Sequence, residues 1–378
     1  MKKVLLIPDS FKGTLSARQV CQIVSEELLR FCPGMEVVSL PVADGGEGTV
    51  DALLTALGGR RVTVSCRGPY GEEMEGFYGL LSDGTAIIEM ASVAGLPLVG
   101  ERKDPSQTTS YGVGQLLSHA AHHGATALIL GLGGSATNDG GCGCAAALGV
   151  RFLDAEGNAF VPVGGTLRHI AAIDMAGLDA AVAALPLTVM CDIDNPLCGP
   201  LGAAAVFAPQ KGADSAMVQM LDDGLRHLAQ IIDRDVGMDV LRLPGGGAAG
   251  GFGAGAASIL GGTLRSGIDA VLDAAQFESH LPDTDLIITG EGKLDSQSLR
   301  GKAVIGVARR ARKMGVPVVA LVGAAEGDLT AVYSEGVSAV FPIHPAPMPF
   351  DVAAPRSAEH LRAAAGNVFR LLLAVTSP

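Results

Sequence analysis

The sequence predicts an α/β protein with a doubly wound parallel sheet that is built from both ends of the chain. A second α/β domain is inserted between them. At both ends, short apolar runs alternate with segments of helical periodicity, and short glycine loops join them. The segment 61–90 instead alternates in polarity and breaks often at turns, as antiparallel strands do. We therefore expect one domain of residues 1–60 and 281–378 and another of residues 61–280.

The first elements of the chain form a strand–helix–strand–helix series. Lys3–Ile7 is a short apolar run typical of a buried parallel strand. Apolar residues at helical spacing follow up to about Arg30, and Thr14 or Ser16 can cap this helix. A second strand is expected over 36–40, and a second helix over 48–57 ends at a Gly-Gly pair.

The end of the chain repeats this pattern. Strands are expected over 285–288, 316–321 and 337–341, and helices over 301–314 and 358–375. In the middle, an α/β pattern resumes after residue 90. There we expect helices over 110–123 and 141–148 and strands over 126–130, 150–153 and 187–190.

Composition and charge narrow the class of protein. The formal net charge of −12 disfavours binding to nucleic acid or to an anionic membrane surface. No apolar run reaches the length of a membrane span, and the apolar run at the N-terminus is too short for a signal peptide. The seven scattered cysteines lack zinc-site spacing and fit free thiols. We therefore expect a cytoplasmic protein whose partners are small molecules.

Two polar clusters follow the first two strands. In Pro8-Asp-Ser-Phe-Lys-Gly13, Lys12 could hold phosphate oxygens and Asp9 a hydroxyl or a metal, although a turn with a helix cap explains this cluster better when it is taken alone. In Ala43-Asp-Gly-Gly-Glu-Gly-Thr49, three glycines expose N–H groups that could bind an anion. Asp44 and Glu47 could bind Mg²⁺ or substrate hydroxyls there, and a flexible acidic loop is the alternative.

The glycine loop 131–141 is the best phosphate site in the sequence. It follows the strand 126–130 and opens a helix, whose N-terminus carries about half a positive charge. Ser135, Thr137 and Asn138 add side-chain donors. Gly131-x-Gly-x-x-Ala136 also satisfies the dinucleotide fingerprint, with Asp154 about twenty residues further on, so an NAD-dependent dehydrogenase of a small hydroxy acid remains an alternative.

Three other segments carry chemistry or glycine. The segment Thr289–Lys302, expected to be a loop, combines Glu291, Lys293, Asp295 and Lys302, which suit a phosphate and a metal. Asp192 and Asp194 follow a strand and project to one side of an extended chain, as a metal-binding pair or base does, or form an Asx-turn before proline. The glycines of 245–255 indicate a hinge, a nucleotide-approach loop or tight packing.

Together these segments resemble the bacterial glycerate kinase family, of the type that yields 2-phosphoglycerate. The resemblance rests on seven motifs in order along nearly the whole chain: 8–13, 43–49, 131–141, 191–200, 207–212, 247–251 and 289–295. It implies ATP, Mg²⁺, D-glycerate and two α/β domains, one of them flavodoxin-like. The sequence lacks the phosphate-binding signatures of P-loop enzymes and protein kinases, so the glycine loops must cradle the phosphates.

From these residues we predict how the site is built. The ATP phosphates are expected on Gly133, Gly134, Ser135, Thr137, Asn138, Lys293 and Lys302, and glycerate on Asp9, Ser10, Asp44, Gly45, Gly46 and Glu47. Mg²⁺ is expected on Asp192, Asp194, Glu291 or Asp295, and Asp192, Asp194 and Lys12 are the expected catalytic residues, with Asp192 as the base. The loops 131–141 and 289–302 are expected to share one cleft. A non-enzymatic sensor of sugar acids or nucleotides is a further alternative.

Overall fold

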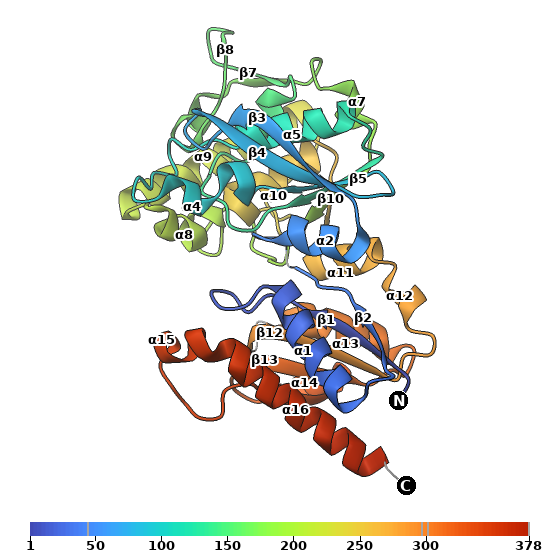
Figure 1. Cartoon of the computed structure of the whole chain (residues 1–378). Helices are drawn as coiled ribbons and strands as arrows, with labels where there is room; N and C mark the ends of the chain where they lie inside the picture. The colour runs from blue at the N-terminus through green and yellow to red at the C-terminus, as the bar shows by residue number, and fades with distance from the viewer. Residues whose placement is uncertain (44, 296–297, 301, 377–378) are drawn as a thin grey trace. The chain divides into compact units, whose positions relative to one another are not determined.

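The computed structural model describes residues 1–43, 45–295, 298–300 and 302–376. These residues form two compact units (Figure 1). The first unit comprises Met1–Asp44, Asp51–Gly58 and Ile268–Pro378, and the second comprises Gly45–Val50 and Gly59–Gly267. Residues 45–50 and 59–60, predicted in the first domain, lie in the second unit, and residues 268–280, predicted in the second domain, lie in the first unit. The domain limits themselves stay a prediction.

The first unit contains a five-stranded parallel sheet in the order β14-β13-β12-β1-β2. Numbered along this unit alone, the order is 2-1-3-4-5, which is the flavodoxin-like order. It confirms the predicted fold class, with both ends of the chain in one sheet. The order reverses between β1 and β12. The strands are β1 Lys3–Pro8, β2 Glu36–Ser39, β12 Leu286–Leu294, β13 Val318–Ala325 and β14 Val337–Pro342.

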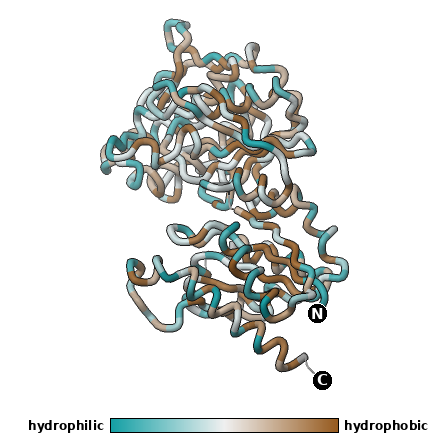
Figure 2. The backbone as a smooth tube through the Cα atoms, in the orientation of Figure 1, coloured by the Kyte–Doolittle hydropathy of each residue, from teal (hydrophilic) through white to brown (hydrophobic). Residues whose placement is uncertain are grey.

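Helices cover both faces of this sheet. Leu6 and Ile288 pack in one cluster with α1 and α16, and the intervening strand residues, such as Ile7, are equally buried on the other face, where α13 packs. In Figure 2 the central strands of this unit are mainly hydrophobic. Ser16 caps α1 as predicted, because its hydroxyl accepts from Gln19 N. The main helices are α1 Ala17–Phe31, α2 Thr49–Leu57, α13 Ala303–Arg312 and α16 Ser357–Thr376.

The remaining helical segments of this part of the chain are short. They connect strands or lie beside the sheet, and they are α11 Gly267–Ala274, α12 Phe277–His280, η3 Ser298–Arg300, α14 Thr330–Ser334, α15 Phe350–Ala353 and η4 Ala354–Arg356.

The second unit is built on a six-stranded sheet in the order β11-β10-β6-β5-β4-β3. Its first four strands are parallel, whereas β4 pairs antiparallel with both β3 and β5, which confirms the antiparallel segment expected over 61–90. The strands are β3 Arg60–Arg67, β4 Glu73–Leu80, β5 Thr85–Glu89, β6 Ala127–Gly131, β10 Leu187–Met190 and β11 Thr263–Arg265.

Helices and a small sheet complete the second unit. The small antiparallel sheet has the order β8-β7-β9, with β7 Arg151–Leu153, β8 Ala159–Phe160 and β9 Ala172–Asp174. The helical segments are α3 Ala91–Ala94, α4 Leu96–Val99, α5 Tyr111–His122, α6 Cys142–Ala147, η1 Gly164–His169, α7 Ala180–Ala183, α8 Ala203–Phe207, η2 Pro209–Lys211, α9 Ser215–Val236 and α10 Ala248–Ser258.

Two elements differ from the sequence-based expectation. β12 continues to Leu294, so Thr289–Lys293 is strand and not loop, because β13 runs beside it as far as Ala325. A Cβ on Gly290 would lie 2.2 Å from Leu321 O, so glycine here permits the close approach of two strands. β7 belongs to the small sheet and does not extend the parallel one.

The glycines of 245–255 serve tight packing. α10 contains three residues with positive φ, at Ala249, Gly250 and Gly251. A Cβ on Gly250 would lie 2.2 Å from Thr137 O, and one on Gly255 would lie 2.1 Å from Gly140 O. α10 therefore packs directly against the loop 131–141. Among the described helices, none combines the length and the hydropathy that a membrane span needs.

Candidate functional site

Two of the predicted glycine loops meet at the carboxyl edge of the second unit's sheet. β6 ends at Gly131, and the following loop packs on residues 45–49. Gly133 N donates to Gly45 O at 3.1 Å. A Cβ on Gly131 would lie 2.3 Å from Gly45 O, and one on Gly133 would lie 2.6 Å from Gly46 Cα. Gly131 and Gly133 are therefore required for the two loops to approach each other.

A carboxylate that the sequence analysis missed holds the loop 45–50 in place. Glu89, the last residue of β5, is buried and accepts from Gly48 N at 3.3 Å and from Val50 N. Of the glycine N–H groups that were expected to bind a ligand anion, that of Gly48 thus binds a carboxylate of the protein. Glu47 is exposed, and Asp44 lies outside the described residues.

Asp139 organises the second half of the loop 131–141. It is fully buried and accepts from Ser110 N and Oγ, both at 2.7 Å, and from Gly141 N and Gly143 N at 3.1 and 3.2 Å. Burial raises the pKa of Asp139, and these hydrogen bonds oppose the rise. Because Asp139 takes the N–H groups at the start of α6, the helix N-terminus is not the open anion site that the sequence suggested.

Lys211 is a second residue that the sequence analysis missed. It ends η2, is 2% exposed, and its Nζ donates to Ser135 Oγ at 2.8 Å and to Thr137 O at 2.7 Å. Burial lowers the pKa of Lys211 to about 7, and the charge of Asp139 opposes this. The sequence signal was the motif 207–212, which contributed to the family resemblance without a role for its lysine.

Thr137 and Asn138 carry polar atoms that the protein does not satisfy. Both residues are fully buried. Among the residues that the structure describes, Thr137 Oγ1 and both polar atoms of the Asn138 amide have no hydrogen-bond partner. Such groups cost free energy unless a ligand or a water molecule binds them. Gly133 is half-buried and Gly134 exposed, whereas Ser135 is buried, so the loop reaches the surface at 133–134.

A separate group of charged residues lies in the first unit, where the sheet order reverses between β1 and β12. Ligands of this fold class bind at the carboxyl ends of strands at that position. Asp9 follows β1, is buried, and its N–H donates to Gly290 O at 2.9 Å. Glu291 lies on β12 and is 4% exposed, and within the described chain its Oε1 has no hydrogen-bond partner. Ser10 N donates to Asp9 Oδ1.

The pKa of Glu291 reflects this crowded carboxylate environment. Burial raises it to about 7, and the charges of Asp9 and Asp295 raise it further, whereas Ser298 and Lys302 act in the opposite direction. A buried carboxyl with an oxygen that has no partner among the described residues is a suitable single ligand for Mg²⁺, which commonly takes only one or two protein carboxylates. Among the described residues, however, no group of three or more His, Cys, Asp or Glu side chains could hold a metal by itself.

The predicted cations of the first unit have different environments. Lys293 is exposed and forms ion pairs with Glu326 at 2.9 Å and Asp295 at 3.6 Å. Lys302 is half-buried and precedes α13 as its N-cap residue. Lys12 is exposed. Of these three lysines, Lys302 is therefore the best candidate for binding a ligand, because its charge acts on the buried Glu291.

Asp192 and Asp194 follow β10 in the second unit. Asp192 is half-buried, and its Oδ1 accepts from Gly267 N at 2.7 Å. Asp194 is exposed. The two predicted metal pairs thus belong to different units, with Asp192 and Asp194 in one and Glu291 and Asp295 in the other.

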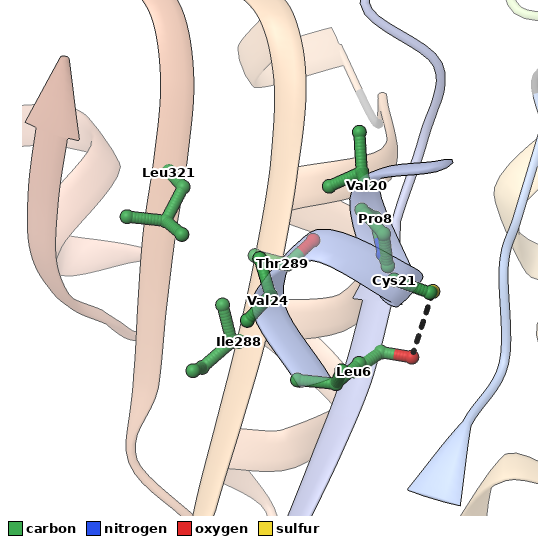
Figure 3. A pocket seen from close by; sticks show the side chains of 8 residues that line it. All are labelled: Leu6, Pro8, Val20, Cys21, Val24, Ile288, Thr289 and Leu321. Carbon is green, nitrogen blue, oxygen red and sulfur yellow. Dashed lines mark hydrogen bonds between the residues drawn. The ribbon is translucent and has the colours of Figure 1, made fainter. Parts of the chain in front are cut away.

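A pocket between α1 and the sheet of the first unit is not suited to bind a polar ligand (Figure 3). It is lined mainly by apolar core residues and has no room for a water molecule. Its Thr289 hydroxyl donates to Ile7 O at 2.7 Å. Burial raises the pKa of the Cys21 thiol at its edge to about 12, so this thiol is unreactive at neutral pH.

The dehydrogenase alternative loses its structural basis. The dinucleotide fingerprint requires the strand after α6 to join the same parallel sheet. β7 instead pairs only with β8 and β9 in the small antiparallel sheet of the described chain. Asp154, the expected ribose ligand, accepts from Glu156 N and Asn158 N within its own turn.

Comparisons with known proteins agree with one another. Residues 4–373 match the sequence model of the glycerate kinase family. Glycerate kinase of Bacillus subtilis (strain 168) is 44% identical over 97% of this chain and 96% of its own. Glycerate 2-kinase of Escherichia coli (strain K12) is 45% identical over 90% of both chains. A crystal structure of a candidate glycerate kinase 2 from Salmonella typhimurium LT2 superposes with a TM-score of 0.89 at 44% identity, covering 100% of each chain.

Proposed function

The chain belongs to the glycerate kinase family, and from this premise we propose that it transfers the terminal phosphoryl group of ATP to the 2-hydroxyl of D-glycerate. The product is then 2-phosphoglycerate, as the name of the Escherichia coli relative suggests. The structural observation that best supports the proposal is the glycine loop with buried, unsatisfied polar atoms at Thr137 and Asn138. A cytoplasmic location stays a prediction.

We assign the ATP phosphates to residues 133–138. Gly133 and Gly134 leave the backbone open to a ligand, and Ser135, Thr137 and Asn138 supply side-chain hydrogen bonds. Phosphoryl transfer depends on positioning and on neutralising charge, more than on covalent chemistry. In a protein of net charge −12, a lysine at this loop is therefore needed to offset the repulsion between protein and nucleotide.

We assign Mg²⁺ to the carboxylates around Glu291 in the first unit. Mg²⁺ commonly uses one or two protein carboxylates and completes its shell with phosphates and water, so Glu291 with Asp295 suffices. When bound, the ion would neutralise phosphate charge. Glu291 presents a buried oxygen without a partner among the described residues, which makes it the strongest ligand of the set. Lys302 is assigned to a phosphate, and the exposed, ion-paired Lys293 to a weaker role.

The remaining roles stay proposals. Asp9 and Ser10 are assigned to glycerate, because both lie at the carboxyl end of β1, where this fold binds ligands. Gly45 and Gly46 act by shaping the adjacent loop, since both are buried against it. Asp192 is assigned to accept the proton of the attacking hydroxyl, with Asp194 and Lys12 as supporting charges.

The test is turnover with a panel of hydroxy acids. ADP release in a coupled assay is expected with D-glycerate, ATP and Mg²⁺, and ATP with Mg²⁺ is expected to raise the melting temperature while NADH leaves it unchanged. Absence of ADP release with every hydroxy acid, together with binding of ATP, would instead favour a sensor.

A further inference from the structure

Lys211 has an unusual environment for a lysine. It is 2% exposed, and both acceptors of its Nζ are neutral: Ser135 Oγ at 2.8 Å and Thr137 O at 2.7 Å. Lysine is almost never fully buried unless it is paired with a charge. The carboxylate whose charge acts on it, Asp139, is engaged by N–H and O–H donors from Ser110, Gly141 and Gly143.

The hydrogen bond to Ser135 fixes what the serine hydroxyl can do. A hydroxyl has one hydrogen to donate and two lone pairs that accept. Because Lys211 donates to Ser135 Oγ, the hydrogen of that hydroxyl is left to donate elsewhere. Ser135 is buried and directly follows the exposed Gly134, so it lies just below the exposed part of the loop. A donor there, with a cation behind it, attracts an anion.

We propose that Lys211 is a positioning residue of the phosphate-binding loop, which orients the Ser135 hydroxyl as a donor to a nucleotide phosphate and ties down the Thr137 carbonyl. This rests on the proposed function for the ligand, and goes beyond it in assigning the role to a residue outside the loop, 76 positions from Ser135.

The ionisation of Lys211 gives the proposal a measurable signature. Burial lowers the pKa of Lys211 to about 7, and the charge of Asp139 opposes this. The next residue, Gly212, packs on the backbone of Lys103. Above that pH the lysine becomes a neutral amine that can accept the Ser135 hydrogen, and the hydroxyl is then lost to the ligand. Phosphate binding should therefore weaken as pH rises above about 7, with bound phosphate shifting the transition upward.

A double-mutant cycle on the full-length protein tests the proposal. ADP binding is measured by calorimetry for the wild type, Lys211→Met, Ser135→Ala and the double variant. Each single change is expected to weaken ADP binding by roughly tenfold, and the double change by no more than the larger single one, because both remove the same interaction. Independent, multiplicative effects, or unchanged binding in Lys211→Met, would overturn it.

Two further measurements separate this role from a structural one. The ratio of ADP dissociation constants between Lys211→Met and the wild type should fall as pH rises from 6 to 9, because only the wild type loses a charged lysine; a constant ratio contradicts the proposal. Lys211→Gln, which keeps a donor, replaces the methionine variant if that fails to fold. If glycerate is turned over but the two substitutions act independently on ADP binding, the role of Lys211 is refuted and the proposed function stands. If ADP binds normally but glycerate is not turned over, the proposed function is refuted and the role of Lys211 stands.

Discussion

The backbone N–H of Gly133 donates to the carbonyl oxygen of Gly45 at 3.1 Å, and this contact fastens two loops that are far apart in the sequence. The loop 131–141 carries the residues of the candidate phosphate site, and the loop 45–50 supports it from the side. Their separation is set by glycines, so the site depends on residues that have no side chain to offer a ligand.

Gly131→Ala should therefore disrupt the site. The added Cβ would meet Gly45 O at 2.3 Å, and this backbone atom has little room to move. We expect a loss of about 1–3 kcal/mol in unfolding free energy and at least tenfold weaker nucleotide binding. Urea denaturation and calorimetry measure the two effects. Gly34→Ala, where a Cβ meets nothing within 4 Å, is the matched control and should change neither.

Thr137→Val should separate binding from stability. Thr137 Oγ1 has no hydrogen-bond partner in the described chain, so an isosteric valine removes no protein contact and should leave the melting temperature equal or higher. The KM for ATP should rise about tenfold. Thr108→Val is the control, because the buried Thr108 hydroxyl donates to Ala136 O at 2.9 Å and its loss should lower stability. A drop in stability without a change in KM at Thr137 would contradict its proposed role.

Glu291→Gln should stabilise the metal-free protein at high pH. Burial raises the folded-state pKa of Glu291 from 4.5 to about 7, so its deprotonation opposes folding, and wild-type stability is lost as pH rises through that range. At pH 8 the variant should be more stable by up to about 3 kcal/mol, and at pH 4 the two should be nearly equal. Chemical denaturation at both values checks this, with exposed Glu101→Gln as control. An equal difference at both pH values would point to packing instead.

Asp192→Asn should lower turnover without unfolding the protein. The asparagine carbonyl can still accept from Gly267 N, so the local structure is retained while the negative charge is removed. If Asp192 is the base, kcat falls by roughly 10²–10⁴-fold at similar KM. Asp194→Asn, at an exposed position, should have a smaller effect. Steady-state kinetics with melting curves for both variants decides the assignment, and near wild-type kcat in Asp192→Asn would remove it.

The regular elements followed from local patterns. Ser16 was one of the two residues predicted to cap the first helix, and the strand 187–190 was predicted with its observed bounds. These depend on neighbours in the sequence, where periodicity and capping act. The sequence analysis missed that the strand continues through Gly290-Glu291-Gly292. Glycines and charged residues are typical of loops, and only the pairing with β13 makes this segment a strand.

The site was predicted only in part, because local patterns are visible in the sequence and contacts between distant segments are not. The glycine loops were identified because glycine clusters are visible in the sequence, and two of them do come together. Lys211 and Glu89 were missed because nothing in their neighbouring sequence shows what each contacts, and the role of each arises from burial against a distant loop. Asp139 was recognised as part of a motif, but its hydrogen bonds could not be read from the sequence. Two come from Ser110, which lies far from it in the sequence, and two come from Gly141 and Gly143, beyond the turn that Asp139 begins. The roles of the individual site residues stay predictions.

The account as a whole is tested most directly by the product. With ATP, Mg²⁺ and D-glycerate, phosphorus NMR should show the growth of the 2-phosphoglycerate resonance together with ADP. A resonance of 3-phosphoglycerate, or loss of ATP as inorganic phosphate with no phosphorylated glycerate, would contradict the proposed reaction.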